Sequence, residues 1–184
     1  MNAPRSYSGI STLNHWITAL LVIAMLVLGF VAGYAPTENA GSYIMGVHIA
    51  LGFFVFWFIL WRVVWRLHEG FPPNQGRTRF EHLAAYWIHR LILLALVFQV
   101  ITGPLYIFTE GEAMDVFGWF SVSLPLESLG VLHEPAEIVH IYLGSYVLPI
   151  IIGLHFLGAA RHYLTKRQET PADLSPLEQG RGDF

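Results

Sequence analysis

Four long apolar segments alternate with short polar segments along the chain. Each has the roughly 20 residues that an α-helix needs to cross the hydrocarbon core of a bilayer, whereas a barrel strand needs only about ten. Because a backbone in lipid must satisfy its hydrogen bonds within the segment, apolar runs of this length predict helices. The pattern therefore predicts an all-α, four-helix transmembrane bundle. The segments run approximately from His15 to Tyr34, Ile44 to Arg66, Leu83 to Phe108 and Glu137 to Arg161.

Two shorter features fall between or at the ends of these segments. Ser11 and Thr12 precede the first segment and are candidate caps of its helix. The sequence VFGWFSV, residues 116–122, lies in the longest connection. It is too short to span a membrane and too apolar to stand free in water, so we expect it to lie at the membrane surface as a lid.

The composition agrees with a membrane protein. Of the 184 residues, 54% are hydrophobic and 12% are charged, and the mean hydropathy is +0.51. Charged residues make up about a quarter of an ordinary soluble domain. The apolar segments leave little chain for anything else, so we expect one transmembrane domain over residues 8–166. Residues 167–184 are rich in Glu, Asp, Gln and Pro, which predicts a disordered tail.

The basic residues predict the orientation. The connections after the first and third segments contain no Lys or Arg, and seven acidic residues lie in or beside them: Glu38, Glu110, Glu112, Asp115, Glu127, Glu134 and Glu137. By the positive-inside rule, both termini and the second connection face the cytoplasm. We call this side inner and the opposite side outer. The ten basic residues are Arg5, Arg62, Arg66, Arg77, Arg79, Arg90, Arg161, Lys166, Arg167 and Arg181.

Histidines are the main interruptions of hydropathy within the apolar segments, since the Asp and Glu residues fall outside the segments or at their ends. His15 and His155 lie near the inner ends of the first and fourth segments, while His48 and His140 lie about one turn inside the outer surface. His140 and His155 are fifteen residues apart, about 22 Å along a helix, and their directions differ by about 60°. A single histidine at membrane depth is equally well explained by a hydrogen bond to a neighbouring carbonyl. Two pairs at matched depths favour two functional sites.

The chemistry of imidazole narrows what these sites can bind. Neutral imidazole suits iron, and a facing pair without Cys, Asp or Glu nearby cannot complete a tetrahedral zinc site. Such a pair can supply both axial ligands of a haem, and bundle cores hold such cofactors. The chain has no cysteine, which excludes covalent C-x-x-C-H haem attachment. Five glycines are expected to leave space for the macrocycle: Gly46, Gly52, Gly144, Gly153 and Gly158.

Spacing leaves the inner site ambiguous. His89 lies at a depth similar to His15 and His155, so three imidazoles compete for two axial positions. Propionates need cations, and the candidates at the inner level are Arg62, Arg66, Arg90 and Arg161. The remaining histidines lie in connections or at helix ends, where we expect solvated or interfacial side chains: His68, His82, His133 and His162.

An ordered set of motifs resembles the bacterial cytochrome b561 family, whose members include superoxide oxidases and hydrogenase-type cytochrome b subunits. The resemblance covers residues 8–166; no single motif is decisive, but the ordered set is specific. The motifs are NHW at 14–16, GVHIALG at 46–52, RVVWRL and FPP at 62–67 and 71–73, AYWIHRLILLAL at 85–96, VFGWF at 116–120, VHIYLG at 139–144 and GLHFLGAARHYL at 153–164.

The resemblance implies two b-type haems. His15 and His155 would be the axial ligands of the inner haem and His48 and His140 those of the outer haem, which makes His89 a neighbour of the inner site and not a ligand. Relatives usually place the two histidines of the last helix fourteen residues apart. Here the separation is fifteen with Pro149 between them, so we expect a local bulge.

Two haems stacked across a bilayer predict a conductor of electrons. Bis-histidine ligation leaves no open position on iron, so substrates must exchange electrons at the haem edge. We expect the quinone pool, with ubiquinone as a possible substrate, to react near Arg62, Arg66, His89 and His162, and a periplasmic redox protein is a candidate partner. Nothing in the sequence predicts a nucleic-acid partner.

Three alternatives stay open. Superoxide oxidation coupled to ubiquinone ranks second, because an acidic outer surface without Lys or Arg would repel an anion. The chain is alternatively the cytochrome b anchor subunit of a larger oxidoreductase. A metal-ion transport path lined by histidines ranks last, since such paths usually add intramembrane carboxylates, which are absent here.

Overall fold

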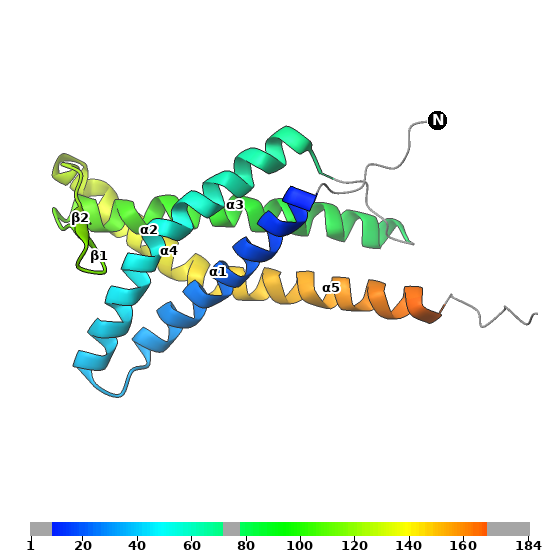
Figure 1. Cartoon of the computed structure of the whole chain (residues 1–184), viewed down its shortest axis with the longest axis horizontal. Helices are drawn as coiled ribbons and strands as arrows, with labels where there is room; N and C mark the ends of the chain where they lie inside the picture. Colours follow the sequence, from blue (N-terminus) through cyan, green and yellow to red (C-terminus); the bar gives the residue numbers. More distant parts are fainter. Residues whose placement is uncertain (1–8, 72–77, 169–184) are drawn as a thin grey trace, which may run out of the picture.

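The computed structural model describes residues 9–71 and 78–168, the last four as backbone only. Its elements form a helical bundle with a small hairpin at one end (Figure 1). Four helical stretches of the described residues are long and apolar enough to cross a membrane: 9–33, 38–69, 79–109 and 127–164. This confirms the predicted four-helix architecture. Residues 167 and 168 still belong to the last helix, and residues 169–184 of the predicted tail lie outside the described residues.

The first three spans are single helices. They are α1 (Gly9–Gly33), α2 (Glu38–Glu69) and α3 (Arg79–Thr109). The Thr37 hydroxyl accepts a hydrogen bond from the Ala40 amide at 3.2 Å and caps α2, and Thr78 and Glu81 form a capping box at the start of α3. The expectation that Ser11 and Thr12 cap the first helix is wrong. Both lie inside α1, and Ser11 is buried against Arg66 of α2 instead.

The fourth span consists of two helices joined by a π-helical turn. They are α4 (His133–Tyr142), η2 (Leu143–Val147) and α5 (Leu148–Gln168). The Leu148 amide donates to the Leu143 carbonyl, which is an i→i+5 bond and inserts one extra residue. The turn ends just before Pro149, which has no amide to donate. The predicted bulge between the two histidines is therefore confirmed.

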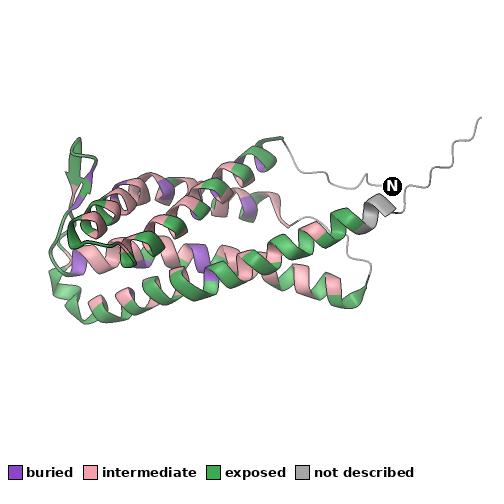
Figure 2. Ribbon diagram, turned by 90° about the horizontal axis from the view of Figure 1, so that it is seen from below, coloured by how far each residue is buried: buried purple, intermediate pink, exposed green. Residues whose placement is uncertain are grey.

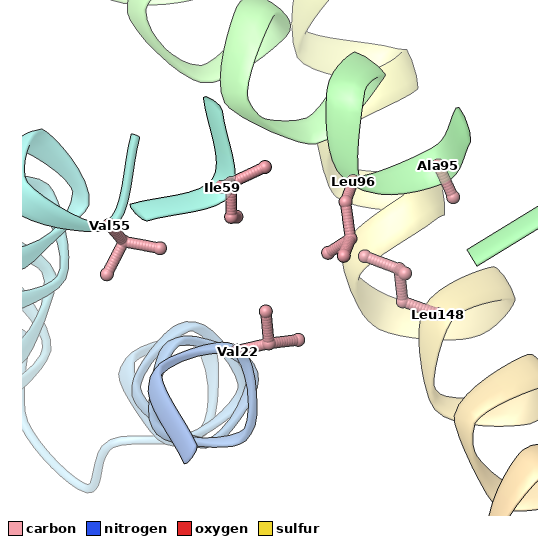
Figure 3. Packing of buried hydrophobic residues seen from close by; sticks show 6 residues of the cluster. All are labelled: Val22, Val55, Ile59, Ala95, Leu96 and Leu148. Atoms are coloured by element: carbon pink, nitrogen blue, oxygen red, sulfur yellow. The ribbon is translucent and has the colours of Figure 1, made fainter. Parts of the chain in front are cut away.

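The bundle is packed around a small apolar core. Residues from α1, α2, α3 and α5 meet there: Val22, Val55, Ile59, Ala95, Leu96 and Leu148 (Figure 3). Outside this core most apolar side chains are exposed, and exposed positions cover the outer faces of the helices (Figure 2). An apolar outer face of this extent is what lipid contact requires.

The connection between α3 and α4 forms a β-hairpin and a 3₁₀ helix. Strands β1 (Met114–Val116) and β2 (Phe120–Val122) pair antiparallel, and η1 (Glu127–Leu132) follows. Phe117 and Gly118 both have positive φ, and the Asp115 carboxylate accepts the Gly118 amide at 2.8 Å, which closes the turn. The rings of Phe117 and Phe120 lie against Phe54 and Phe53 of α2. The predicted surface element is thus a hairpin seated on α2.

Candidate functional site

Three of the intramembrane histidines meet at one end of the bundle. His15 of α1 and His155 of α5 face each other with ring centroids 6.3 Å apart and ring planes at 81°. His89 of α3 also packs against His155, with centroids 5.0 Å apart and planes at 72°. The structure therefore brings together all three imidazoles that the sequence placed at the inner level.

The remaining two intramembrane histidines form a second pair. His48 of α2 and His140 of α4 have ring centroids 6.2 Å apart and ring planes at 89°. His48 comes early in its helix, as does His140 in the fourth span, whereas His155 comes late in that span. The two pairs therefore lie at different levels of the bundle, as the sequence predicted.

The separations of the rings distinguish these contacts. An imidazole nitrogen binds a transition metal at about 2.0–2.1 Å, so two rings on opposite sides of one metal have centroids roughly 6 Å apart. The His15–His155 and His48–His140 separations of 6.3 and 6.2 Å fit this geometry. The His89–His155 separation of 5.0 Å is too short for a metal between the rings.

Each pair supplies only two ligands. Within residues 9–71 and 78–168, no group of three or more His, Asp or Glu side chains is placed to hold a metal ion. A metal at either pair would therefore need the rest of its coordination from another molecule. A porphyrin, which provides four equatorial nitrogens, meets this requirement.

The surroundings of His140 fix the orientation of its ring. Its Nδ1 lies 3.1 Å from the carbonyl oxygen of Gln99 and 3.4 Å from Thr102 Oγ1. Because a carbonyl can only accept, the Nδ1 nitrogen carries the proton, and Nε2 is the unprotonated nitrogen that could bind a metal in place of its present neighbour. The amide nitrogen of Gln99 lies 3.3 Å from this Nε2 and donates to the His140 carbonyl at 3.2 Å.

Two glycines let the outer pair sit close to neighbouring helices. A Cβ atom added at Gly103 of α3 would lie 2.9 Å from Cε1 of His140, a distance that real Cβ atoms essentially never show. One added at Gly29 of α1 would lie 3.3 Å from Cε1 of His48. Gly29 therefore serves close approach, while a Cβ atom added four residues later at Gly33 would meet nothing within 4 Å.

The five glycines expected to leave room for a macrocycle divide into two groups. A Cβ atom at Gly46, Gly153 or Gly158 would meet nothing within 4 Å, which agrees with open space. At the other two a neighbouring side chain lies close by. Gly52 packs on Met25 and Gly144 packs on the Gln99 amide, at 3.4 and 3.0 Å from the added Cβ atom.

A cavity of about 300 Å³ opens beside the inner pair. Residues of all four spans line it, and those with polar groups include Thr18, Arg62, Arg66 and the three inner histidines. The Thr18 hydroxyl is buried and has no hydrogen-bond partner. An unsatisfied buried hydroxyl beside two guanidinium groups fits the polar substituents of a bound molecule.

The two cavity arginines point into the bundle. Arg62 donates to the Ser11 carbonyl at 3.4 Å and to Asn14 Oδ1 at 3.3 Å, and its other terminal nitrogen lies 3.3 Å from Nδ1 of His15. Arg66 is only 3% exposed. It donates to Ser11 Oγ at 3.0 Å and to the Gly70 carbonyl at 2.9 Å. Both side chains are therefore placed where the carboxylates of a cofactor can reach them.

Other residues expected at the inner site are directed elsewhere. Arg90 stacks on Tyr86 and Phe71, and Arg161 forms an ion pair with Glu81 at 2.8 Å. Neither arginine lines the cavity, and neither does His162. Depth along the helix axis was predicted correctly for these residues, but the direction of the side chain was not.

The histidines at the helix ends behave as expected. His68, His82 and His162 are exposed. His133 is half-buried, with Nδ1 3.1 Å from the Tyr106 carbonyl and its ring 4.8 Å from that of Tyr106. These four side chains belong to neither pair.

Sequence reasoning missed several neutral residues around the two pairs. Thr102 and Gly103 of α3 contact His140, and Asn14 and Thr18 of α1 flank His15. A signal was present, because Asn14 and Thr18 are four residues apart and Gln99 and Thr102 three apart, so each polar pair shares one helix face. Polar pairs on one face of a membrane helix indicate a bundle-facing site.

Comparison with known proteins agrees with the resemblance seen in the motifs. Residues 6–172 match the family described as prokaryotic cytochrome b561. The chain is also similar to cytochrome b561 homolog 2 of Escherichia coli (strain K12), with 27% identity over 174 residues. The match covers 90% of this chain and 89% of the relative.

Proposed function

We propose that this chain, which belongs to the prokaryotic cytochrome b561 family, conducts electrons across the membrane through two bis-histidine haems b and exchanges them with the quinone pool. Family membership makes it a multi-pass membrane cytochrome that binds haem b and takes part in electron transfer. The proposal adds the number of haems, their ligands and the quinone. The observation that carries it is the pair of imidazole contacts at 6.3 and 6.2 Å.

The ring distances support His15 over His89 as the inner ligand. Only the His15–His155 separation accommodates a metal between the rings, while His89 packs against His155 at 5.0 Å. We therefore assign His15 and His155 to the inner haem and His48 and His140 to the outer haem. His89 then supports His155 without binding iron.

The surrounding residues prepare the ligands. A bound haem b supplies a one-electron couple between ferric and ferrous iron. The Gln99 carbonyl holds the proton on Nδ1 of His140 and leaves Nε2 for the metal. Ligation through Nε2 of His15 likewise requires a proton on Nδ1, where Arg62 now donates. The N–H group of Arg62 would then need another acceptor. The carboxylates of a haem bound in the cavity would be acceptors within its reach.

The π-helical turn offers a test of the assignment of His140 and His155, both in the fourth span, as haem ligands. Deleting Ser145 is expected to turn η2 into a regular α-helical turn and to keep both haems, because the histidines would then be fourteen residues apart, as is usual in relatives. Inserting one alanine after Ser145 would rotate His155 by about 100° relative to His140 and should remove one haem. Haem content per chain measures both variants. Equal haem content in the deletion and the insertion would contradict the assignment.

The cavity beside the inner pair supports a quinone site. Arg62 and Arg66 line it and would meet the haem carboxylates, whereas His89, which also lines it and does not bind iron, offers a hydrogen-bond donor to a quinone carbonyl at the edge of the haem. His162, also expected there, does not line the cavity, so the quinone proposal rests on His89 with the two arginines beside it. The arrangement of basic residues supports an orientation with this side and both termini toward the cytoplasm of a bacterial inner membrane.

The outer surface favours a cationic or neutral electron donor over superoxide. Glu110, Glu112, Asp115, Glu127 and Glu134 are all exposed in the segment between α3 and the first turn of α4. Their field would repel an anion and attract a basic redox protein. Superoxide oxidation therefore remains the second candidate.

The experiment that tests the function combines a spectrum with a quinol assay. The purified protein should show a reduced-minus-oxidised spectrum of b-type haem with two haems per chain, and a soluble quinol should reduce it. His89→Ala should keep both haems but lower the affinity for quinol roughly five- to tenfold, since one hydrogen bond is worth about 1–1.5 kcal/mol. The exposed His82 on the same helix is the control. An unchanged affinity for quinol in His89→Ala would contradict the quinone site. One haem per chain would contradict electron transfer across the membrane through two haems.

A further inference from the structure

Permanent positive charge is concentrated at the inner imidazole pair. Arg62 reaches to 3.3 Å from Nδ1 of His15 and lines the same cavity as His155. Arg66 lines the same cavity and is almost fully buried. Glu69 lies 3.8 Å from Arg66, so one carboxylate accompanies two guanidinium groups at this level.

In the described part of the chain, the groups seen in contact with the outer pair carry no such charge. The groups that contact His140 are neutral: the Gln99 amide and carbonyl, the Thr102 hydroxyl and Gly103. Glu137 lies one turn before His140 on α4. None of the ten Lys and Arg residues falls in the first or third connection. The environment of the outer pair is therefore neutral to negative.

We propose that Arg62 and Arg66 make the inner site the more oxidising of the two, so that electrons pass downhill from the outer side to the inner side. The inference rests on the proposed function, because it requires a haem at each imidazole pair. Positive charge near iron favours the ferrous state, which carries one positive charge less than the ferric state. In a buried, poorly screened environment such interactions are strong, and the surroundings of a haem are known to set its potential.

The direction of transfer follows from this asymmetry. With a haem held by each pair, the His48–His140 site would take one electron from an outer one-electron donor, which is oxidised, and the electron would move on to the His15–His155 site. Two such electrons and two protons from the cytoplasmic side convert one quinone to quinol. Arg62 and Arg66 thus favour the reduction of quinone by an outer donor over the reverse reaction.

An equilibrium redox titration followed by haem absorbance tests the order of the two sites. We expect two components whose equilibrium constants differ at least tenfold, which corresponds to 59 mV for a one-electron couple. The high-potential component should persist in His48→Ala and His140→Ala and disappear in His15→Ala and His155→Ala. The opposite assignment, or two components of equal potential, would overturn the inference. Two haems of equal potential would leave the proposed function intact, whereas a single haem per chain would contradict that function itself.

Variants of Arg62 and Arg66 test whether their charge causes the difference in potential between the two sites. Arg62→Gln and Arg66→Gln should each lower the high-potential component and leave the low-potential component in place, while Arg62→Lys, which keeps the charge, should restore most of the difference. Arg79→Gln removes an exposed cation at the same end of the bundle and should change neither component. An equal shift of both components in Arg62→Gln would overturn the role of the arginines. If that variant fails to bind haem, the order of potentials in the unaltered protein still decides the proposal.

Discussion

Replacing His140 by alanine is expected to remove the outer haem, keep the inner one and so halve the haem content of the purified protein. The reason is that the groups around this pair are poor replacements for a lost histidine ligand. His48 and His140 face each other at 6.2 Å, and the groups around them are amides, hydroxyls and glycines that are poor ligands for iron. His48→Ala should have the same effect. Haem content per chain, measured from the reduced spectrum, reports both.

The inner site offers a sharper comparison, because it has one imidazole more than it needs. His15→Ala should remove the inner haem, whereas His89→Ala should retain it, since His89 lies too close to His155 to share a metal with it. His133→Ala is the matched control at the outer end, where the imidazole is bonded to the Tyr106 carbonyl and belongs to neither pair. Retention of two haems in His15→Ala together with their loss in His89→Ala would reverse the assignment.

Bound cofactor also adds to the stability of the fold. The apolar core of the bundle is small, with six buried residues in its main cluster, and any molecule that binds only the folded state stabilises it by mass action. Variants that lose one haem should therefore unfold at a lower temperature than the unaltered protein. Thermal unfolding followed by helical circular dichroism provides a second readout that does not depend on haem absorbance.

The sequence predicted the helices and the depth of their functional residues well. Membrane spans are long, continuous and apolar, so their existence does not depend on tertiary contacts. The depth of His48 or His155 follows directly from its position in the span. The pairing of helices at equal depth then required only that consecutive spans run in opposite directions.

The sequence did not determine directions around the helix axis. Arg66 and Arg90 lie at similar depth, yet Arg66 enters the cavity and Arg90 stacks on Tyr86 and Phe71. The choice between His15 and His89 likewise needed the separations of 6.3 and 5.0 Å from His155, which spacing along the chain cannot supply. Rotation of a helix is set by its packing against its neighbours.

The hairpin after α3 escaped prediction for a different reason. Its strands are three residues long, too short for an alternating pattern to stand out. The turn places Phe117 at φ 56°, a conformation that bulky residues rarely adopt and that no propensity favours. The rings of Phe53 and Phe54 on α2 hold the hairpin in place, and that contact exists only in the folded chain.

Replacing a glycine beside the outer pair by alanine is expected to be unfavourable, whereas the same substitution inside an ordinary helix is favourable. Replacing a helix-interior glycine by alanine usually stabilises the helix by about 0.5–1 kcal/mol. At Gly103 the new methyl group would lie 2.9 Å from Cε1 of His140. The ring cannot move away freely, because its Nδ1 is bonded to the Gln99 carbonyl on the same helix. Gly103→Ala should therefore displace His140 and sharply reduce the outer haem while keeping the inner one.

A graded series makes this prediction specific. Gly29→Ala should have a milder effect, because its Cβ atom would lie 3.3 Å from Cε1 of His48, and Gly46→Ala should have almost none, because nothing lies within 4 Å of its Cβ atom. Outer-haem content in the three variants should then rise in the order 103, 29, 46 even as intrinsic helix propensity improves equally in all of them. Full outer-haem content in Gly103→Ala would show that His140 does not hold the outer iron from the position it occupies here.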